Sequence, residues 1–320
     1  MGVPSHRTIH IHNTGLSLHV VEEGSGPAVL LLHGFPETSY SWRHQMSSLA
    51  GAGFHVIAPD MRGYGASDAP ESSEEYTSLH IVGDIIGLLD TFNLKEVYVV
   101  GHNWGAIIGW DLCLFRPDRV KAYVAVSLPF LLRGPHRSFM DFYRELLGEG
   151  FYMTRFQEPG GMEAEFASVG TSEVLQRILA SEGSFPICIP EGNEILDLIP
   201  EVTTLPPWCT EEDLKHYTEQ FERSGFTGPL NYYRAINRTW ELKAPWTNMT
   251  VLTTTLFISG DKDLLHTLPN LQDYVYGGAF QMEVPNLKGV VTLEGGHFIH
   301  QQQAAEFNDH VIKFFKEHPL

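Results

Sequence analysis

Short runs of apolar residues alternate with amphipathic stretches along most of this chain. Five runs have the length and the Val, Ile and Leu content of β-strands: 16–23, 28–33, 54–60, 96–102 and 121–127. The later runs are almost wholly apolar, which is typical of parallel strands that helices cover on both faces. The alternation therefore predicts an α/β fold with a doubly wound, mostly parallel sheet.

The stretches between the strands show helical periodicity. Residues 77–93 place their apolar side chains, among them Val82 and Leu89, on one helical face. Thr77 or Ser78 stands at the start of this stretch, where a hydroxyl side chain can cap a helix. A crossover helix of this kind is what two parallel strands need between them.

The pattern of apolar and polar residues changes in the middle of the chain. From 128 to 245 the strand patterns disappear, and helix formers punctuated by Pro and Gly replace them. Strand patterns return at 255–261 and 289–296. We therefore predict a core formed by 1–127 and 246–320, with residues 128–245 inserted into it as an α-helical lid.

Charge and cysteine content narrow the class of protein. Of 320 residues, 39 are acidic and 21 basic, and the net charge of −18 repels nucleic acid and anionic membranes. No run of about 18 apolar residues predicts a membrane span. Cys113, Cys188 and Cys209 are an odd number, widely spaced, and form no CxxC pair, which favours a reducing compartment. We expect a cytoplasmic protein, a monomer or a homodimer, with no nucleic-acid or membrane partner.

The run "VVGHNWGAIIGW" at 99–110 has the outline of a nucleophile elbow. A strand, a turn and a helix follow one another, and Gly101 and Gly105 flank the residue at the turn. That residue is Asn103, whose amide is a poor nucleophile because its lone pairs are delocalised. An ordinary strand-to-helix turn is the alternative interpretation. The elbow interpretation predicts that Asn103 points into a pocket.

A second loop is expected to face the elbow. The segment "LLHGFPET" at 31–38 ends another apolar strand, and the backbone N–H of Phe35 can act with that of Trp104 as a pair of oxyanion donors. A tight turn without a function is the alternative for this loop.

Two later strands end in an acid and a base. "FISGDKDLL" places Asp261 and Asp263 after one strand, and "LEGGHFIHQ" places His297 after the next. Nucleophile, acid and base follow one another in the order known for triads on doubly wound sheets. We favour Asp263 as the acid, because Asp261 directly follows a strand-ending glycine and is placed to close a turn. We interpret His300 as a solvated helix residue and His102 as a packing neighbour of the elbow.

Six segments spread over nearly the whole chain carry a family resemblance. They are "HGFPETSYSWRHQ" (33–45), "APDMRGYGASDAP" (58–70), "GHNWG" (101–105), "LCLFRPDRVKA" (112–122), "RFQEPG" (155–160) and "GFTGPLNYYRA" (225–235). Together they resemble the plant soluble epoxide hydrolases of the α/β-hydrolase superfamily. The resemblance implies an α/β-hydrolase fold with a helical cap, no cofactor, no metal and a small apolar epoxide as substrate.

The same resemblance implies roles for particular residues. Tyr152 and Tyr233 match the two lid tyrosines that hold and protonate the epoxide oxygen. His297, oriented by Asp263, would activate water to hydrolyse an ester intermediate, with Phe35 and Trp104 stabilising its oxyanion. Without the resemblance, lid tyrosines are equally well interpreted as core residues, and Tyr232 is the neighbouring alternative to Tyr233.

The chain departs from the family pattern at Asn103, where the family has aspartate. Either the substitution was engineered to silence the enzyme, or it is native and the remaining acid, base and tyrosines act differently. A native asparagine leaves three functions open: one-step epoxide hydrolysis, cyclisation by the substrate's own hydroxyl, and ligand binding without turnover. Dehalogenation is less favoured, because it does not require the tyrosine of "NYYRA". A serine-type esterase is excluded by Asn103, unless that residue is artificial.

Overall fold

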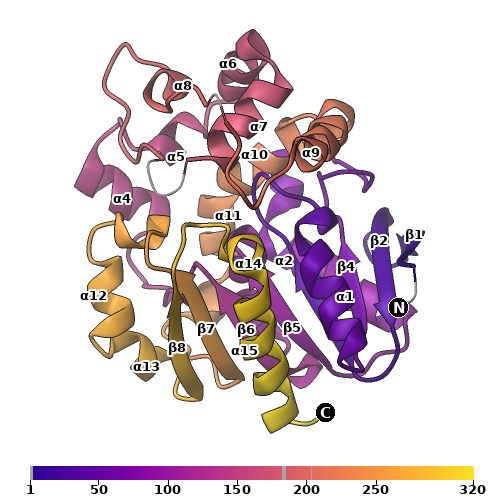
Figure 1. Cartoon of the computed structure of the whole chain (residues 1–320). Coiled ribbons are helices and arrows are strands. Elements are labelled where there is room, and N and C mark those ends of the chain that lie inside the picture. The colour runs from indigo at the N-terminus through magenta and orange to yellow at the C-terminus, as the bar shows by residue number, and fades with distance from the viewer. Residues whose placement is uncertain (1–2, 182–184, 203) are drawn as a thin grey trace.

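An eight-stranded sheet runs through the computed structural model, which describes residues 3–181, 185–202 and 204–320 (Figure 1). Its strands, in the order β1-β2-β4-β3-β5-β6-β7-β8 across the sheet, are β1 (Ser5–Ile11), β2 (Leu16–Gly24), β3 (Ala28–Leu32), β4 (His55–Pro59), β5 (Val97–His102), β6 (Val120–Val126), β7 (Thr254–Gly260) and β8 (Leu287–Leu293). β2 pairs antiparallel with β1 and β4, and all other neighbours are parallel. The prediction of a mostly parallel, doubly wound sheet is confirmed.

Strand β1 was not predicted from the sequence. It lies at the edge of the sheet and pairs with β2 from Ser5↔Glu22 to Ile11↔Leu16. Most of its side chains are exposed, and its sequence "SHRTIHI" contains no apolar run. Backbone hydrogen bonds to a neighbouring strand define this element, and a hydrophobic pattern cannot reveal such bonds.

Helices cover both faces of the sheet. α1 (Arg43–Gly51) and α15 (Ala304–Glu317) lie side by side in front of it in Figure 1, whereas α2 (Ser78–Thr91) and α3 (Trp104–Phe115) cover the opposite face. Alternate residues of β3 enter two separate cores: Val29 and Leu31 join the first pair of helices, and Leu30 and Leu32 join the second. This alternation explains why the central strands are apolar throughout.

The chain between β6 and β7 is helical in the residues described. It contains α4 (Phe139–Leu147), α5 (Tyr152–Arg155), α6 (Gly161–Val169), α7 (Thr171–Leu179), α8 (Ile195–Leu198), α9 (Glu211–Ser224), α10 (Thr227–Arg234) and α11 (Ile236–Leu242). We call this segment the helical insertion. Most of it lies beyond the carboxyl ends of the strands (Figure 1), so that it faces the edge of the sheet where the predicted chemistry lies. The proposed boundaries, 127/128 and 245/246, stay a prediction.

The remaining helical elements are short. They are α12 (Leu271–Tyr276), α13 (Ala279–Glu283), α14 (Ile299–Gln302) and 3-10 turns at Ser39–Trp42, Ser73–Tyr76, Pro117–Arg119, Ala244–Trp246 and Leu264–His266. Across the described part of the chain, none of the helices has the length and apolar character needed to cross a bilayer. The three cysteines are free, with Cys113 and Cys209 buried.

Candidate active site

Asn103 occupies a strained turn between β5 and α3. Its φ of 52° and ψ of −118° lie outside the regions that side-chain-bearing residues usually adopt. A Cβ on Gly34 would lie 2.4 Å from the Cβ of Asn103, and one on Gly105 would lie 2.0 Å from the carbonyl oxygen of Leu32. Only glycines therefore let the two loops approach this closely, and the approach holds Asn103 at the carboxyl edge of the sheet.

The amide of Asn103 is held in one orientation. Its Oδ1 accepts hydrogen bonds from the backbone N–H of Phe35 (3.0 Å) and of Trp104 (2.7 Å). Its Nδ2 lies 2.9 Å from Nε2 of His297. Because two N–H donors need an oxygen between them, the amide nitrogen must be the atom that faces the imidazole. Nδ2 therefore donates to Nε2, and the proton of a neutral His297 lies on Nδ1.

His297 contacts two buried residues through Nδ1. Asp263 Oδ1 is 3.1 Å away and Ser127 Oγ is 2.9 Å away, while the Ser127 hydroxyl itself donates to Asp263 Oδ1 over 3.0 Å. Asp261 is exposed, and it accepts a hydrogen bond from the backbone N–H of Gly295. The structure thus brings Asn103, His297 and Asp263 together and leaves Asp261 in the neighbouring turn.

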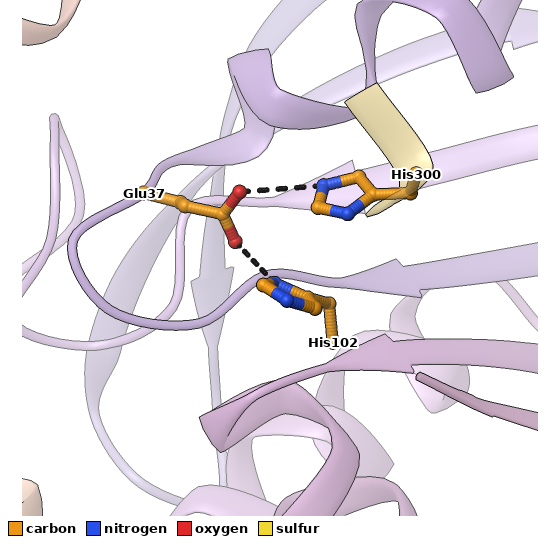
Figure 2. Close-up of side chains that lie close together, drawn as sticks. All are labelled: Glu37, His102 and His300. Carbon is orange, nitrogen blue, oxygen red and sulfur yellow. Dashed lines mark hydrogen bonds and ion pairs between the residues drawn. The ribbon is translucent and has the colours of Figure 1, made fainter. Parts of the chain in front are cut away.

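A buried carboxylate lies behind this group. Glu37 accepts from His102 Nδ1 at 2.7 Å through one oxygen, and its other oxygen lies 3.3 Å from His300 Nε2, as Figure 2 shows. The other ring nitrogen of His102 lies 2.8 Å from the carbonyl oxygen of His297. Since both ring nitrogens of His102 face oxygen acceptors, both must carry protons. His102 is therefore a cation paired with Glu37, and it fixes the backbone of His297.

The pKa values agree with this ion pair. Burial alone would raise the pKa of Glu37, but the charge of His102 and its hydrogen bond hold it well below its usual value. Burial alone would lower the pKa of His102, but the charge of Glu37 and its hydrogen bond raise it. Burial lowers the pKa of His300 to about 4, which makes His300 a neutral neighbour.

Glu37, His102 and His300 also have the composition of a metal site. One ligand atom from each lies within 4.8 Å of the others. However, Glu37 already receives N–H groups from His102, Gln301 and Gly34. A protonated Nδ1 on His102 cannot act as a ligand. The hydrogen bonds therefore favour an ion pair over a metal centre.

A cavity of about 450 Å³ lies over Asn103. Trp104, Tyr152 and Tyr233 line it together with apolar side chains such as Ile107. Asn103 belongs to this lining, so that the elbow opens into the cavity as predicted. A cavity of this size and character suits a small apolar ligand.

Tyr152 and Tyr233 reach the cavity from α5 and α10. Phe156 lies between them, with ring centroids 5.4 Å from Tyr152 and 4.9 Å from Tyr233. Burial raises the pKa of Tyr152 well above 10, and burial also raises the pKa of Tyr233, although a hydrogen bond with Trp104 opposes that rise. Both side chains therefore stay protonated and remain hydrogen-bond donors. Tyr232 instead donates to the carbonyl oxygen of Arg62 at 2.9 Å, as a structural residue does.

Sequence reasoning was wrong about one residue of the site and missed two others. His300 was expected to be solvated, but it is fully buried against Glu37. Glu37 and Ser127 were not singled out. For Ser127 a signal exists in its position directly after β6, at the same sheet edge as Asn103 and with a positive φ of 74°.

Comparisons with known proteins identify the family. Residues 27–303 match the family model described as the alpha/beta hydrolase fold. The chain is 47% identical over 311 residues to epoxide hydrolase 3 of Siraitia grosvenorii, with 97% of this chain and 98% of the relative covered. It is 37% identical over 330 residues to epoxide hydrolase A of Mycobacterium tuberculosis, with 98% of each covered.

Solved structures agree with the sequence comparisons. A crystal structure of an epoxide hydrolase from Vigna radiata matches with a TM-score of 0.91 and 44% identity, covering 98% of each chain. A laboratory-evolved variant of potato epoxide hydrolase matches with a TM-score of 0.93 and 42% identity, covering 98% of this chain and all of that one. This chain therefore belongs to the α/β-hydrolase fold family and, within it, to the plant epoxide hydrolases.

Proposed function

We propose that this protein binds a small apolar epoxide in the cavity over Asn103 and supplies an acid and a base for opening its ring. The observation that carries the proposal is the sharing of one cavity by Tyr152, Tyr233 and Asn103, with His297 and Asp263 hydrogen-bonded behind the amide. The names of the relatives support the substrate class.

The two tyrosines suit the leaving oxygen of an epoxide. When a ring carbon is attacked, negative charge develops on the oxygen, and a neutral hydroxyl that donates to it lowers the barrier. Tyr152 and Tyr233 qualify because burial keeps both of them protonated by raising the pKa of each. The apolar lining around them accommodates the carbon skeleton of the substrate.

Asn103 cannot form the covalent ester of the usual two-step reaction. Its oxygen is engaged by two backbone N–H donors, and the atom that faces His297 is a nitrogen without an available lone pair. In its asparagine form the site therefore has one remaining route, direct attack by water or by a hydroxyl of the substrate, with His297 as general base. The pairing of His297 with Asp263 suits a general base, and it therefore favours direct attack over ligand binding without turnover.

The test compares the chain with its Asn103→Asp variant on a panel of apolar epoxides, with products analysed by mass spectrometry. Restoring a covalent nucleophile is expected to raise turnover by about 10⁴- to 10⁶-fold. Intact mass must show that Asn103 is unchanged in the parent during the assay. If neither form hydrolyses any epoxide, the proposed function is wrong.

Single turnover in ¹⁸O-labelled water separates the two routes. In the two-step route the first diol takes its new oxygen from the unlabelled carboxylate of the aspartate variant. Direct attack in the asparagine form places solvent label in the diol, and cyclisation introduces none. Unlabelled diol from the intact asparagine form would contradict direct attack by water.

A further inference from the structure

The hydrogen bonds of Asn103 are those that a hydrolase makes to a bound amide. Its carbonyl oxygen lies in a pair of backbone N–H donors at 3.0 and 2.7 Å. The leaving nitrogen lies 2.9 Å from an imidazole that is itself oriented by a carboxylate. The amide carbon is therefore activated as an electrophile, and a base that can also act as an acid lies beside it.

We propose that the protein hydrolyses the side-chain amide of its own Asn103 and so generates an aspartate nucleophile. This inference rests on the proposed function, because the product is the group that a two-step epoxide hydrolase needs. The reaction requires only water. The substrate of this further activity is the side chain itself, and it is already seated in the site.

The steps balance in atoms and electrons. A water molecule attacks Cγ of Asn103 and passes a proton to Nε2 of His297, while the π electrons of the carbonyl move to Oδ1. The N–H groups of Phe35 and Trp104 stabilise the resulting oxyanion. When the carbonyl re-forms, the Cγ–Nδ2 bond breaks and the nitrogen takes the proton from His297. Ammonia leaves, and a carboxyl group remains at position 103.

The geometry separates this reaction from ordinary deamidation. Spontaneous loss of ammonia begins when the backbone nitrogen of the next residue attacks the amide carbon. Here the N–H of Trp104 is directed at Oδ1 and its residue opens helix α3. The backbone nitrogen is thus held by the same hydrogen bond that activates the amide for attack by water.

The chain contains matched internal controls. Asn93, Asn248 and Asn270 also have positive φ angles, between 56° and 67°, and all three are exposed. None of them is followed by glycine, the residue that most favours spontaneous deamidation. If backbone strain alone made asparagine labile, these three residues would convert as readily as Asn103.

The test follows Asn103 by peptide mass mapping in freshly purified protein, with ¹⁸O-labelled water as solvent. Hydrolysis adds the mass difference between –NH₂ and –OH, and the new carboxylate carries one solvent oxygen. We expect Asn103 to convert at least about 10²-fold faster than the three control asparagines. Conversion of Asn103 at the rate of the controls would overturn the proposal.

The variant His297→Phe, expressed and purified in parallel, provides the second arm. It should retain Asn103 as asparagine under conditions in which the parent converts, including any conversion complete before purification. Circular dichroism checks that the variant is folded. Equal conversion in folded His297→Phe would overturn the proposal, because the imidazole would then play no part.

Peptide mass mapping needs no epoxide, so the self-hydrolysis of Asn103 and the proposed function are tested independently of each other. If Asn103 stays intact while Asn103→Asp turns over epoxides, the self-hydrolysis inference is wrong and the proposed function stands. If Asn103 converts but no epoxide is opened by either form, the self-hydrolysis stands and the proposed substrate class is wrong.

Discussion

The two sides of the candidate site hold their functional side chains in opposite ways. On the core side, hydrogen bonds fix Asn103, His297 and Asp263, and a buried ion pair fixes the backbone of His297. On the insertion side, Tyr152 and Tyr233 make edge contacts with Phe156, and Tyr233 has a further hydrogen bond, with Trp104. Bonded partners therefore set protonation and direction on the core side, whereas exclusion of water keeps the donors protonated on the insertion side.

This difference predicts how the removal of a side-chain group affects each side of the site. On the core side, loss of one group leaves a buried polar partner without its hydrogen bond, which affects both stability and rate. On the insertion side, a tyrosine hydroxyl can be removed while the aromatic packing stays in place. Variants of the two sides should therefore separate catalytic effects from structural ones.

The largest effect is expected from His297→Phe in the Asn103→Asp background. Removing the base should prevent water from hydrolysing the ester, so that turnover falls by about 10⁴- to 10⁶-fold. Intact mass after mixing with an epoxide should show one equivalent of covalent adduct. Sustained turnover without an adduct would show that the core side does not work through an ester.

A smaller loss is expected from Tyr152→Phe combined with Tyr233→Phe in the same background. The double variant removes both donors to the epoxide oxygen, and kcat should fall by about 10²- to 10⁴-fold. The binding of an apolar ligand should change little, because the rings and their contacts with Phe156 remain. Stopped-flow kinetics and equilibrium binding measure the two quantities.

The matched control for the insertion side is Tyr232→Phe. Tyr232 donates to the carbonyl oxygen of Arg62 and is buried within the same helix as Tyr233. Its variant should lower the free energy of unfolding by about 1 kcal/mol without affecting kcat. A loss of kcat equal to that of the double variant would mean that packing, and not proton donation, is the role of these tyrosines.

The fold was predictable because apolar periodicity reports burial. Strands β2 to β8 and helix α2 follow from that pattern, and the position of Asn103, Asp263 and His297 after strand ends follows from it too. The pattern failed for β1, an edge strand with exposed side chains. Tyr152 and Tyr233 needed the family resemblance, because periodicity cannot distinguish a cavity-facing aromatic from a core one.

The buried contacts of Glu37 with His102 and His300 could not be predicted from the sequence alone. Glu37 meets His102 across 65 residues of chain and lies beside His300 across a still longer separation. His300 follows His297 by three residues, and nothing in that short segment indicates such a contact, so His300 was interpreted as a solvated helix residue. Only tertiary packing distinguishes a paired buried histidine from an exposed one.

The buried ion pair leads to a stability prediction. Glu37→Gln leaves cationic His102 without its carboxylate, and loss of one partner of a buried pair costs about 3–5 kcal/mol. Chemical denaturation measures the difference from the parent, and Glu22→Gln, at a partly exposed carboxylate that pairs with Arg7, is the control. A difference as small as that of the control would show that the pair does not stabilise the core side.

The pH dependence of that difference has a definite sign. The pKa of Glu37 is lowered on folding, so its contribution is present above its usual value of 4.5 and is lost as pH falls through the folded value. The pKa of His102 is raised on folding, so its contribution is complete below 6.5 and is lost as pH rises through the folded value. The difference in the free energy of unfolding between parent and Glu37→Gln should therefore be largest between pH 4.5 and 6.5. It should decrease as pH rises through the folded pKa of His102 and as pH falls through the folded pKa of Glu37.

The smallest effect is expected at Ser127, whose hydroxyl links Asp263 with His297. Ser127→Ala in the Asn103→Asp background removes one hydrogen bond to a carboxylate, and kcat should fall about tenfold with KM unchanged.

Ser127 also has a positive φ of 74°, which favours glycine. Ser127→Gly thus removes the hydroxyl and relieves the strain, and it should be more stable than Ser127→Ala by about 1 kcal/mol. If the hydroxyl positions the imidazole, both variants lose the same rate and shift the pH profile of kcat alike. If Ser127→Gly keeps the rate of the parent, backbone geometry is the contribution of Ser127, and the core side relies on fewer bonded partners than we infer.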